Sequence, residues 1–339
     1  MKKILMISDD SFSPVKIFIS HIAKYCKGFI LLGHDFRNVS YNSIIKELCP
    51  FKSKTLKKYF YKNKADQILI DYAKGYKPDI VIIVSPKFFD LLSVIRLRDN
   101  LPGAMFVGFD GDPWPKIKPE KLDTAKGFDI MLATNDGQWL QDYRDAGAPK
   151  CFFIPNMCDP DIDKRYEVDE KWKTEILWIG TAEHRANKTD SFRLNLITKL
   201  AQSDNCTLYG CCGKPKIGGL DSLYAISGAK IGVSVNAYEG VRLAHSDRLT
   251  RFLAGGTMVL AKRFPDCELL YKDGIHLKYF DTVEEFFELA DYYLNNEEER
   301  EKIADTGMRH VHENFNCKKI ASYVLDIVEK GTYSAPWRS

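Results

Sequence analysis

The run DIVIIVS, residues 79–85, constrains the fold of this chain more than any other segment. Its residues 80–84 are all apolar and β-branched, without the alternation of a strand that keeps one face in water. Such a run is typical of a parallel strand whose two faces are both covered by helices. Gly75 and Pro78 separate it from a helical stretch at 64–74. The segment therefore predicts an α/β fold.

Strand and helix patterns alternate along both halves of the chain, as a doubly wound sheet requires. Further strands are expected at 3–8, 29–35, 105–110, 130–134, 151–155, 174–180, 207–210, 230–236 and 257–261. Further helices are expected at about 15–25, 87–99, 138–147, 191–202, 219–226, 247–254, 283–294 and 318–330. We expect two doubly wound, Rossmann-like domains that face each other across a cleft.

The domain boundaries follow from a change in composition between the two halves. Residues 156–173 are polar, contain proline and lack periodicity, so we expect a linker there. This gives an N-terminal acceptor-binding domain at 1–155 and a C-terminal nucleotide-sugar-binding domain at 174–317. Residues 318–339 form a final helix and tail, which we expect to pack back on the first domain.

Length, charge and cysteine usage exclude some classes of protein. No apolar run reaches the roughly 18–20 residues that a membrane span needs. Nine cysteines, an odd number in a long chain, do not indicate a disulfide framework, and their spacing favours no metal site, so we expect reduced thiols and a cytoplasmic protein. The net charge of +3 indicates no particular partner. Residues 52–64 contain six lysines among aromatic residues, which suits either a solvated segment or a peripheral contact with anionic lipid or nucleic acid.

Carboxylates follow two strands of the first half. Asp9 and Asp10 come after the first strand, as a helix cap or as ligand contacts. Asp110 and Asp112 lie in FDGDPWP, residues 109–115. A carboxylate at this edge could deprotonate an acceptor hydroxyl; Asp-x-Asp could instead hold a metal, or the segment could be an Asx turn. Asp110 and Asp112 are the catalytic candidates.

A basic loop follows the first strand of the second half. Neither a Walker phosphate loop nor a G-x-G-x-x-G pattern precedes it. Gly180 would let a ligand approach the backbone, and four potential cations come next. These are His184, Arg185, Lys188 and Arg193. Their charges would suit a pyrophosphate, although basic loops are common.

Two more strands of the second half end in polar residues. Tyr209 begins YGCCGK, whose small residues could receive a planar base, and Asn236, Glu239 and His245 follow the next strand. A helix then starts at Ser246 or Asp247, with Arg248 in its first turn, and Gly255 and Gly256 end it. Such a helix start suits a diphosphate, or is one more unit of scaffold.

Residues 174–325 resemble the C-terminal domain of the "glycosyl transferases group 1" superfamily, especially its spore-maturation and surface-polysaccharide branch. The likeness lies in the order of ILWIGTAEHR, KIGVSVNAYEG, SDRLTRFLAGGTMVLA and the closing block 274–316. Residues 105–162 resemble the end of that branch's N-terminal domain. The resemblance implies a two-domain B-type glycosyltransferase fold (GT-B), with Gly180 and Arg185 at the donor phosphates and Ser246, Asp247 and Arg248 at donor sugar or phosphate. Arg251 stands where the family usually has a glutamate that contacts ribose, so Glu239 takes that role or the donor differs.

We therefore expect a glycosyltransferase that needs no metal or other cofactor. It would move a sugar from a nucleotide-sugar donor, UDP- or GDP-linked, to a hydroxyl of a glycan, a lipid-linked acceptor or another surface polymer. The donor-binding candidates are Gly180, Arg185, Lys188, Tyr209, Asn236, Glu239, His245, Ser246, Asp247 and Arg248. The alternatives are a non-catalytic carbohydrate-binding or envelope or spore structural protein of the same fold, a metal-dependent transferase, and a nucleic-acid glucosylating enzyme.

Overall fold

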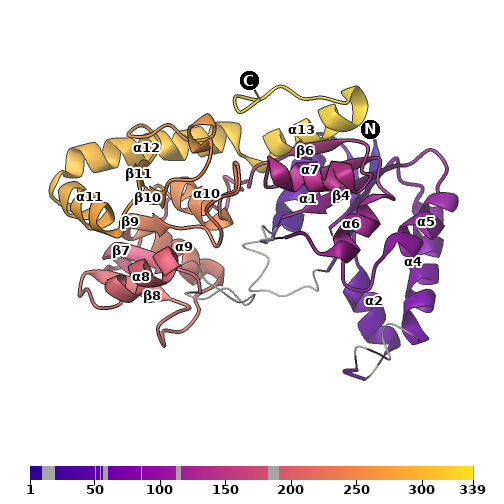
Figure 1. Cartoon of the computed structure of the whole chain (residues 1–339), viewed down its shortest axis with the longest axis horizontal. Helices are drawn as coiled ribbons and strands as arrows, with labels where there is room; N and C mark the ends of the chain where they lie inside the picture. The colour runs from indigo at the N-terminus through magenta and orange to yellow at the C-terminus, as the bar shows by residue number, and fades with distance from the viewer. Residues whose placement is uncertain are drawn as a thin grey trace. The chain divides into compact units, whose positions relative to one another are not determined.

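The structure is a computed structural model that describes residues 1–9, 20–49, 51–53, 55, 60–84, 86–111, 116–181 and 191–338 (Figure 1). These residues divide into two compact units. Residues 1–9, 20–154 and 321–333 form unit 1, and residues 155–320 and 334–338 form unit 2.

Unit 1 is built on a six-stranded parallel sheet with the strand order β2-β1-β3-β4-β5-β6. Its strands are β1 (Lys3–Ser8), β2 (Asp35–Ser40), β3 (Ile80–Ile83), β4 (Met105–Asp110), β5 (Ile130–Ala133) and β6 (Cys151–Phe153). The apolar run at 79–85 provides β3, which is fully buried between β1 and β4. The parallel α/β sheet predicted from that run is confirmed.

Helices connect these strands. They are α1 (His21–Leu31), α2 (Tyr41–Leu48), α4 (Lys62–Tyr76), α5 (Leu91–Asp99), α6 (Pro119–Ala125) and α7 (Gln138–Asp145). The last helix, α13 (Cys317–Lys330), returns the chain to unit 1, where the Tyr333 hydroxyl donates a hydrogen bond to the carbonyl of Phe153.

Unit 2 has a five-stranded parallel sheet with the order β11-β10-β9-β7-β8. Its strands are β7 (Thr174–Ile179), β8 (Cys206–Tyr209), β9 (Ala229–Ser234), β10 (Met258–Lys262) and β11 (Lys278–Phe280). Its helices are α8 (Ser191–Leu200), α9 (Gly219–Ser227), α10 (Asp247–Ala254), α11 (Val283–Asn295) and α12 (Glu297–Asn314), with short 3-10 turns η3 (Glu170–Trp172) and η4 (Cys267–Leu269). Two consecutive Rossmann-like units are the components of the GT-B fold, so the predicted fold class is confirmed.

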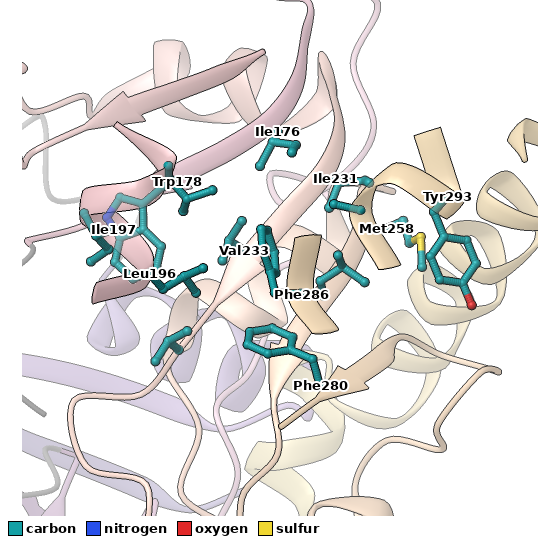
Figure 2. Close-up of a cluster of buried hydrophobic side chains, with 14 of the residues drawn as sticks. Ile176, Trp178, Leu196, Ile197, Ile231, Val233, Met258, Phe280, Phe286 and Tyr293 are labelled. Atoms are coloured by element: carbon teal, nitrogen blue, oxygen red, sulfur yellow. The ribbon is translucent and has the colours of Figure 1, made fainter. Parts of the chain in front are cut away.

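The core of unit 2 lies between the sheet and the helices α8 and α11 (Figure 2). Side chains of β7 and β9 meet those of α8, and Phe280 and Phe286 continue the cluster towards α11. Trp178 and Tyr293 lie towards opposite ends of the side chains drawn in Figure 2. Trp178 is the largest fully buried side chain of the described residues, and it underlies the candidate site.

The expected strand at 29–35 is wrong. Residues 29–31 are the last turn of α1, which begins after Ser20, whose side chain accepts a hydrogen bond from the amide of Ala23. Ile30 and Leu31 are 53% and 52% exposed, so their apolar character does not reflect burial in a sheet. The true strand, β2, is largely polar because it lies at an edge of the sheet.

Residues 156–173, which we expected to be a linker, pack on unit 2. The Arg165 guanidinium donates to the carbonyl of Gly256 at 2.8 Å, and the amide of Tyr166 donates to the Ser227 hydroxyl at 3.0 Å. Hydrogen bonds of this kind hold the segment on unit 2 although its sequence has no periodicity.

Two further expectations concern membranes and thiols. No helix in the described part of the chain is long and apolar enough to cross a membrane. All nine cysteines are free thiols, and no group of three or more His, Cys, Asp or Glu side chains within the described ranges is arranged to hold a metal ion.

Candidate functional site

The loop before α10 is held in shape by hydrogen bonds from Asn236. Its amide nitrogen donates to the carbonyl of Ala244 at 2.8 Å, and its amide oxygen accepts from the backbone N–H of Ser246 at 3.0 Å. Ser246 is the N-cap of α10, and its side chain accepts from the amide of Arg248. Asn236, at the carboxyl end of β9, therefore fixes where α10 begins and where its positive end points.

Two arginines lie against the same indole ring near the start of this helix. The guanidinium carbon of Arg248 is 4.0 Å from the ring centroid of Trp178, and that of Arg193, on α8, is 5.1 Å from it. Both guanidinium groups also donate to the carbonyl of Val235, at 3.4 and 3.5 Å. We call Arg193 and Arg248 the arginine pair. The helices α8 and α10 thus bring two like charges together at the carboxyl ends of β7 and β9.

The arginine pair has positive charge and N–H groups to spare. Buried N–H groups without a hydrogen-bond partner are Nε of Arg193 and both Nε and Nη1 of Arg248. Neither guanidinium forms a salt bridge with a carboxylate in the described part of the chain. Burial and the charge of Arg193 lower the pKa of Arg248 to about 9, and burial also lowers the pKa of Arg193. Charges held in this way are stabilised by an anion, which would supply both the opposite charge and the missing acceptors.

The backbone of Gly180 lies directly against Arg248. Its φ is 149°, a value that residues other than glycine rarely adopt, and its amide donates to the carbonyl of Tyr209 at 2.9 Å. A Cβ atom at this position would lie 3.2 Å from Nη1 of Arg248. The backbone after β7 and the unpartnered face of Arg248 therefore border the same space.

His245 has a role in packing rather than at the arginine pair. It is 5% exposed, and its two ring nitrogens lie 3.2 Å from the carbonyl of Leu243 and 3.3 Å from the hydroxyl of Tyr271. Burial lowers its pKa to about 4, so the ring is neutral near pH 7. Because both ring nitrogens of His245 already have partners, none is left to bind the nucleotide sugar. We therefore leave His245 out of the candidate site.

Arg251, which stands at the position of the family's usual glutamate, is also structural. Its Nη2 donates to the Ser222 hydroxyl of α9 at 3.0 Å, and its Nε is 3.7 Å from a carboxylate oxygen of Asp163. It is 9% exposed. Arg251 therefore joins α9 and the segment 156–173 to α10 instead of recognising an acidic group of the donor.

The remaining donor-binding candidates are at the margins of this arrangement. Glu239 is half-buried, 4.0 Å from the ammonium of Lys262, and Tyr209 and Asp247 are half-buried at the end of β8 and the start of α10. Arg185 and Lys188 lie outside the described residues.

Asp110, the described member of the catalytic pair, belongs to a buried network in unit 1. One carboxylate oxygen is 2.5 Å from the ammonium of Lys121, and the other accepts from the hydroxyl of Tyr143 at 2.7 Å. The side chain is 2% exposed. Both oxygens are thus engaged, as in a structural ion pair. Asp112 lies outside the described residues, and the catalytic role of either stays a prediction.

The sequence alone did not identify two parts of the site. Trp178 looked like an ordinary strand residue, and the carbonyl of Val235 carries no sequence signal. Arg193, by contrast, is one of the four cations expected after the first strand of the second half, and it lies on α8.

The fold defines a class of protein with two Rossmann-like units, and the second unit carries the arginine pair near the start of α10. Residues 192–326 match the sequence model of a family described as "Glycosyl transferase-like". Residues 192–326 are therefore similar to this glycosyl transferase-like family, which agrees with the glycosyltransferase predicted from the sequence. No curated protein sequence matches the chain.

Solved structures are similar in fold to nearly the whole chain. A glycosyltransferase from Rickettsia africae is 14% identical with a TM-score of 0.62, over 97% of this chain and 98% of that one. Anabaena HepE in complex with UDP-glucose is 12% identical, also with a TM-score of 0.62, over 97% and 100%. Sucrose-phosphate synthase from Thermosynechococcus elongatus is 12% identical with a TM-score of 0.64, over 97% and 99%. At these identities the likeness concerns the fold.

Proposed function

We propose that this protein transfers a sugar from a nucleotide-sugar donor to a hydroxyl group, and that the arginine pair binds the donor diphosphate. The observation that carries the proposal is the set of buried, unpartnered N–H groups on Arg193 and Arg248 beside Gly180. The start of α10, which Ser246 caps and whose first turn contains Asp247, adds further backbone N–H donors nearby. A diphosphate supplies both the charge and the acceptor oxygens that this place lacks.

The same groups would assist the reaction. As the acceptor oxygen bonds to the anomeric carbon, the bond from that carbon to the diphosphate oxygen breaks, and negative charge grows on the diphosphate. Two guanidinium groups already in position stabilise that charge without reorganisation. They provide the positive charge for which other transferases use a divalent metal, so we propose a metal-independent reaction, with activity unchanged by EDTA.

We propose UDP as the nucleotide, because the similar HepE structure contains UDP-glucose. Glu239 is our proposed ribose contact, since Arg251 is occupied by Ser222 and Asp163 and cannot replace the family's glutamate. Packing explains why an arginine stands at position 251, so the loss of the family's glutamate is not evidence for a non-catalytic protein of this fold.

The proton of the acceptor needs a destination if the reaction inverts configuration. The two partners of Asp110 leave it no free oxygen, so we propose Asp112 as the base in that case. In a retaining reaction the departing diphosphate oxygen would take the proton, so no protein base would be needed.

Thermal shift and calorimetry with UDP, GDP and their sugar derivatives test the proposal. A ligand that binds the native state raises the melting temperature, so UDP and UDP-sugars should do so. A larger shift with GDP would change the nucleotide but keep the site. No shift with any nucleotide would refute the proposed function.

We also propose a peripheral contact of unit 1 with an anionic membrane at the inner face, consistent with a lipid-linked or surface-polymer acceptor. Phe51, just before the lysine-rich segment 52–64, and Phe60, within it, are 59% and 71% exposed. Lys62 is not available for this contact, because its ammonium is 2.9 Å from Asp66 and the side chain is buried. Sedimentation with phosphatidylglycerol vesicles, but not phosphatidylcholine vesicles, is expected, and Phe60→Ser should weaken it. Equal sedimentation with both lipids would contradict an electrostatic contact.

A further inference from the structure

Asn135 is a buried amide without hydrogen bonds at the carboxyl end of β5. The side chain is 1% exposed, and neither its Nδ2 nor its Oδ1 has a partner. The residue before it, Thr134, is firmly held. Its amide donates to the carbonyl of Asp110 at 3.1 Å, and its hydroxyl donates to the carbonyl of Gly111 at 2.9 Å. A rigid backbone thus holds in place an amide whose burial without partners destabilises the free protein.

The start of α7 lies next to this amide and also has donors to spare. Gly137, two residues after Asn135, is the N-cap, with a φ of 68° and no side-chain hydrogen bond to the helix, and the first turn contains no acidic residue. The first amides of a helix have no partner within it. Trp139, in the same turn, is 5% exposed, and its indole N–H is buried without a partner. Several unused donors and one unused acceptor therefore gather at the edge of the sheet where open α/β units bind ligands.

The balance of these groups points to the chemistry of the ligand. An amide donates and accepts at the same time, and so does each hydroxyl of a sugar, so Asn135 suits two neighbouring hydroxyl groups. Asp136 is half-buried between Asn135 and the N-cap, and its negative charge disfavours an anion there. A neutral, hydroxyl-rich ligand fits this set better than a phosphate.

We propose that unit 1 binds a carbohydrate portion of the acceptor through Asn135, with Trp139 and the start of α7 as additional donors. This inference rests on the proposed function and names the class of its acceptor. Asn135 would then determine acceptor specificity and leave the binding of the nucleotide unaffected.

The substitution Asn135→Leu separates this role from a structural one. Leucine keeps a similar shape and removes the unpartnered amide, so the melting temperature should stay the same or rise. Gln141→Leu, at an exposed position later in α7, is the matched control. A fall in melting temperature for Asn135→Leu well beyond that of the control would show that the amide has partners in the fold, and would overturn the proposal.

Binding is measured by hydrogen exchange of residues 135–141 with methyl glycosides of glucose, galactose and mannose at millimolar concentration. At least one should slow exchange at the start of α7 in the wild type and in Gln141→Leu. In Asn135→Leu the apparent affinity should fall by about tenfold or more, the effect of losing hydrogen bonds to a bound ligand. No protection by any of these sugars, or equal protection in Asn135→Leu, would overturn the proposal.

The same samples keep this inference distinct from the proposed function. UDP should slow exchange at residues 246–250 equally in all three proteins, because that site lies in unit 2. If UDP protects but no sugar does, the donor site stands and the role of Asn135 is refuted. If sugars protect but UDP does not, the proposed function fails while the carbohydrate site stands.

Discussion

Replacing Arg248 with methionine should weaken binding of UDP and leave the fold intact. Two N–H groups of Arg248, Nε and Nη1, are buried without partners and would face the diphosphate. A hydrogen bond to a charged group contributes about 1.5–3 kcal/mol, so losing two costs about 3 kcal/mol or more, which is roughly a hundredfold or greater increase in Kd. Isothermal titration calorimetry with UDP measures this directly.

The stability of the same variant distinguishes a ligand-binding arginine from a structural one. Burial and Arg193 lower the pKa of Arg248 to about 9, so the charged form is less stable in the ligand-free protein than it is in water. Methionine keeps the packing against Trp178 and removes that charge, so the free energy of unfolding should be unchanged or higher.

Arg251→Met, in the same helix, is the matched control with the opposite expectation. It removes the guanidinium that faces the buried carboxylate of Asp163 and donates to the Ser222 hydroxyl, a change that destabilises by about 3 kcal/mol. UDP affinity of the folded protein should change little. The reasoning is refuted if Arg248→Met destabilises as much as Arg251→Met, or if it binds UDP as tightly as the wild type.

Three further substitutions test other parts of the structure. Gly180→Val places a branched side chain at a φ of 149° and against Arg248, so UDP affinity should fall by about tenfold or more in calorimetry; unchanged affinity would place the ligand elsewhere. Burial lowers the pKa of His245 to about 4, below its value of about 6.5 in the unfolded chain. The contribution of this histidine to the free energy of unfolding is therefore complete above about pH 6.5, and it falls by on the order of 3 kcal/mol as the pH drops towards 4. Urea denaturation between pH 7.5 and 5 should show a smaller loss for His245→Phe, and an identical loss would exclude this histidine as the cause. Asp110→Asn leaves Lys121 without its counter-charge and should lower the free energy of unfolding by about 2 kcal/mol, whereas a neutral effect would argue against a structural ion pair.

Buried strands were the most predictable part of the fold. A continuous apolar run such as 79–85 has few alternatives, and β3 lies within it. The segment 29–35 has a similar composition, but its apolar residues end a helix whose start is set by Ser20. Helix and strand cannot be separated by composition when the run is short, and the edge position of β2 removed the apolar signal from the true strand.

The helix start at 246–248 could be predicted because capping is local. Ser246 needs only the amide of Arg248, two residues away, and Gly256 ends the helix with a φ of 74°. The anion-binding face could not be predicted in the same way. It depends on Trp178 and Arg193, which lie 70 and 55 residues before Arg248 in the sequence, and only the order of strands brings them together.

Arg248 and Arg251 show why residue type alone does not assign a role. They lie three residues apart in α10, and both are charged groups taken largely out of water. Around Arg251 the fold supplies a carboxylate and a hydroxyl, so the charge is compensated by the protein itself. Around Arg248 it supplies an aromatic ring, a second arginine, the neighbouring Asp247 and two long hydrogen bonds donated by Nη2, at 3.4 Å each, and Nε and Nη1 stay without an acceptor. Buried N–H groups without acceptors are stabilised by a ligand that supplies them, which is why we propose Arg248 as a ligand contact and Arg251 as part of the fold.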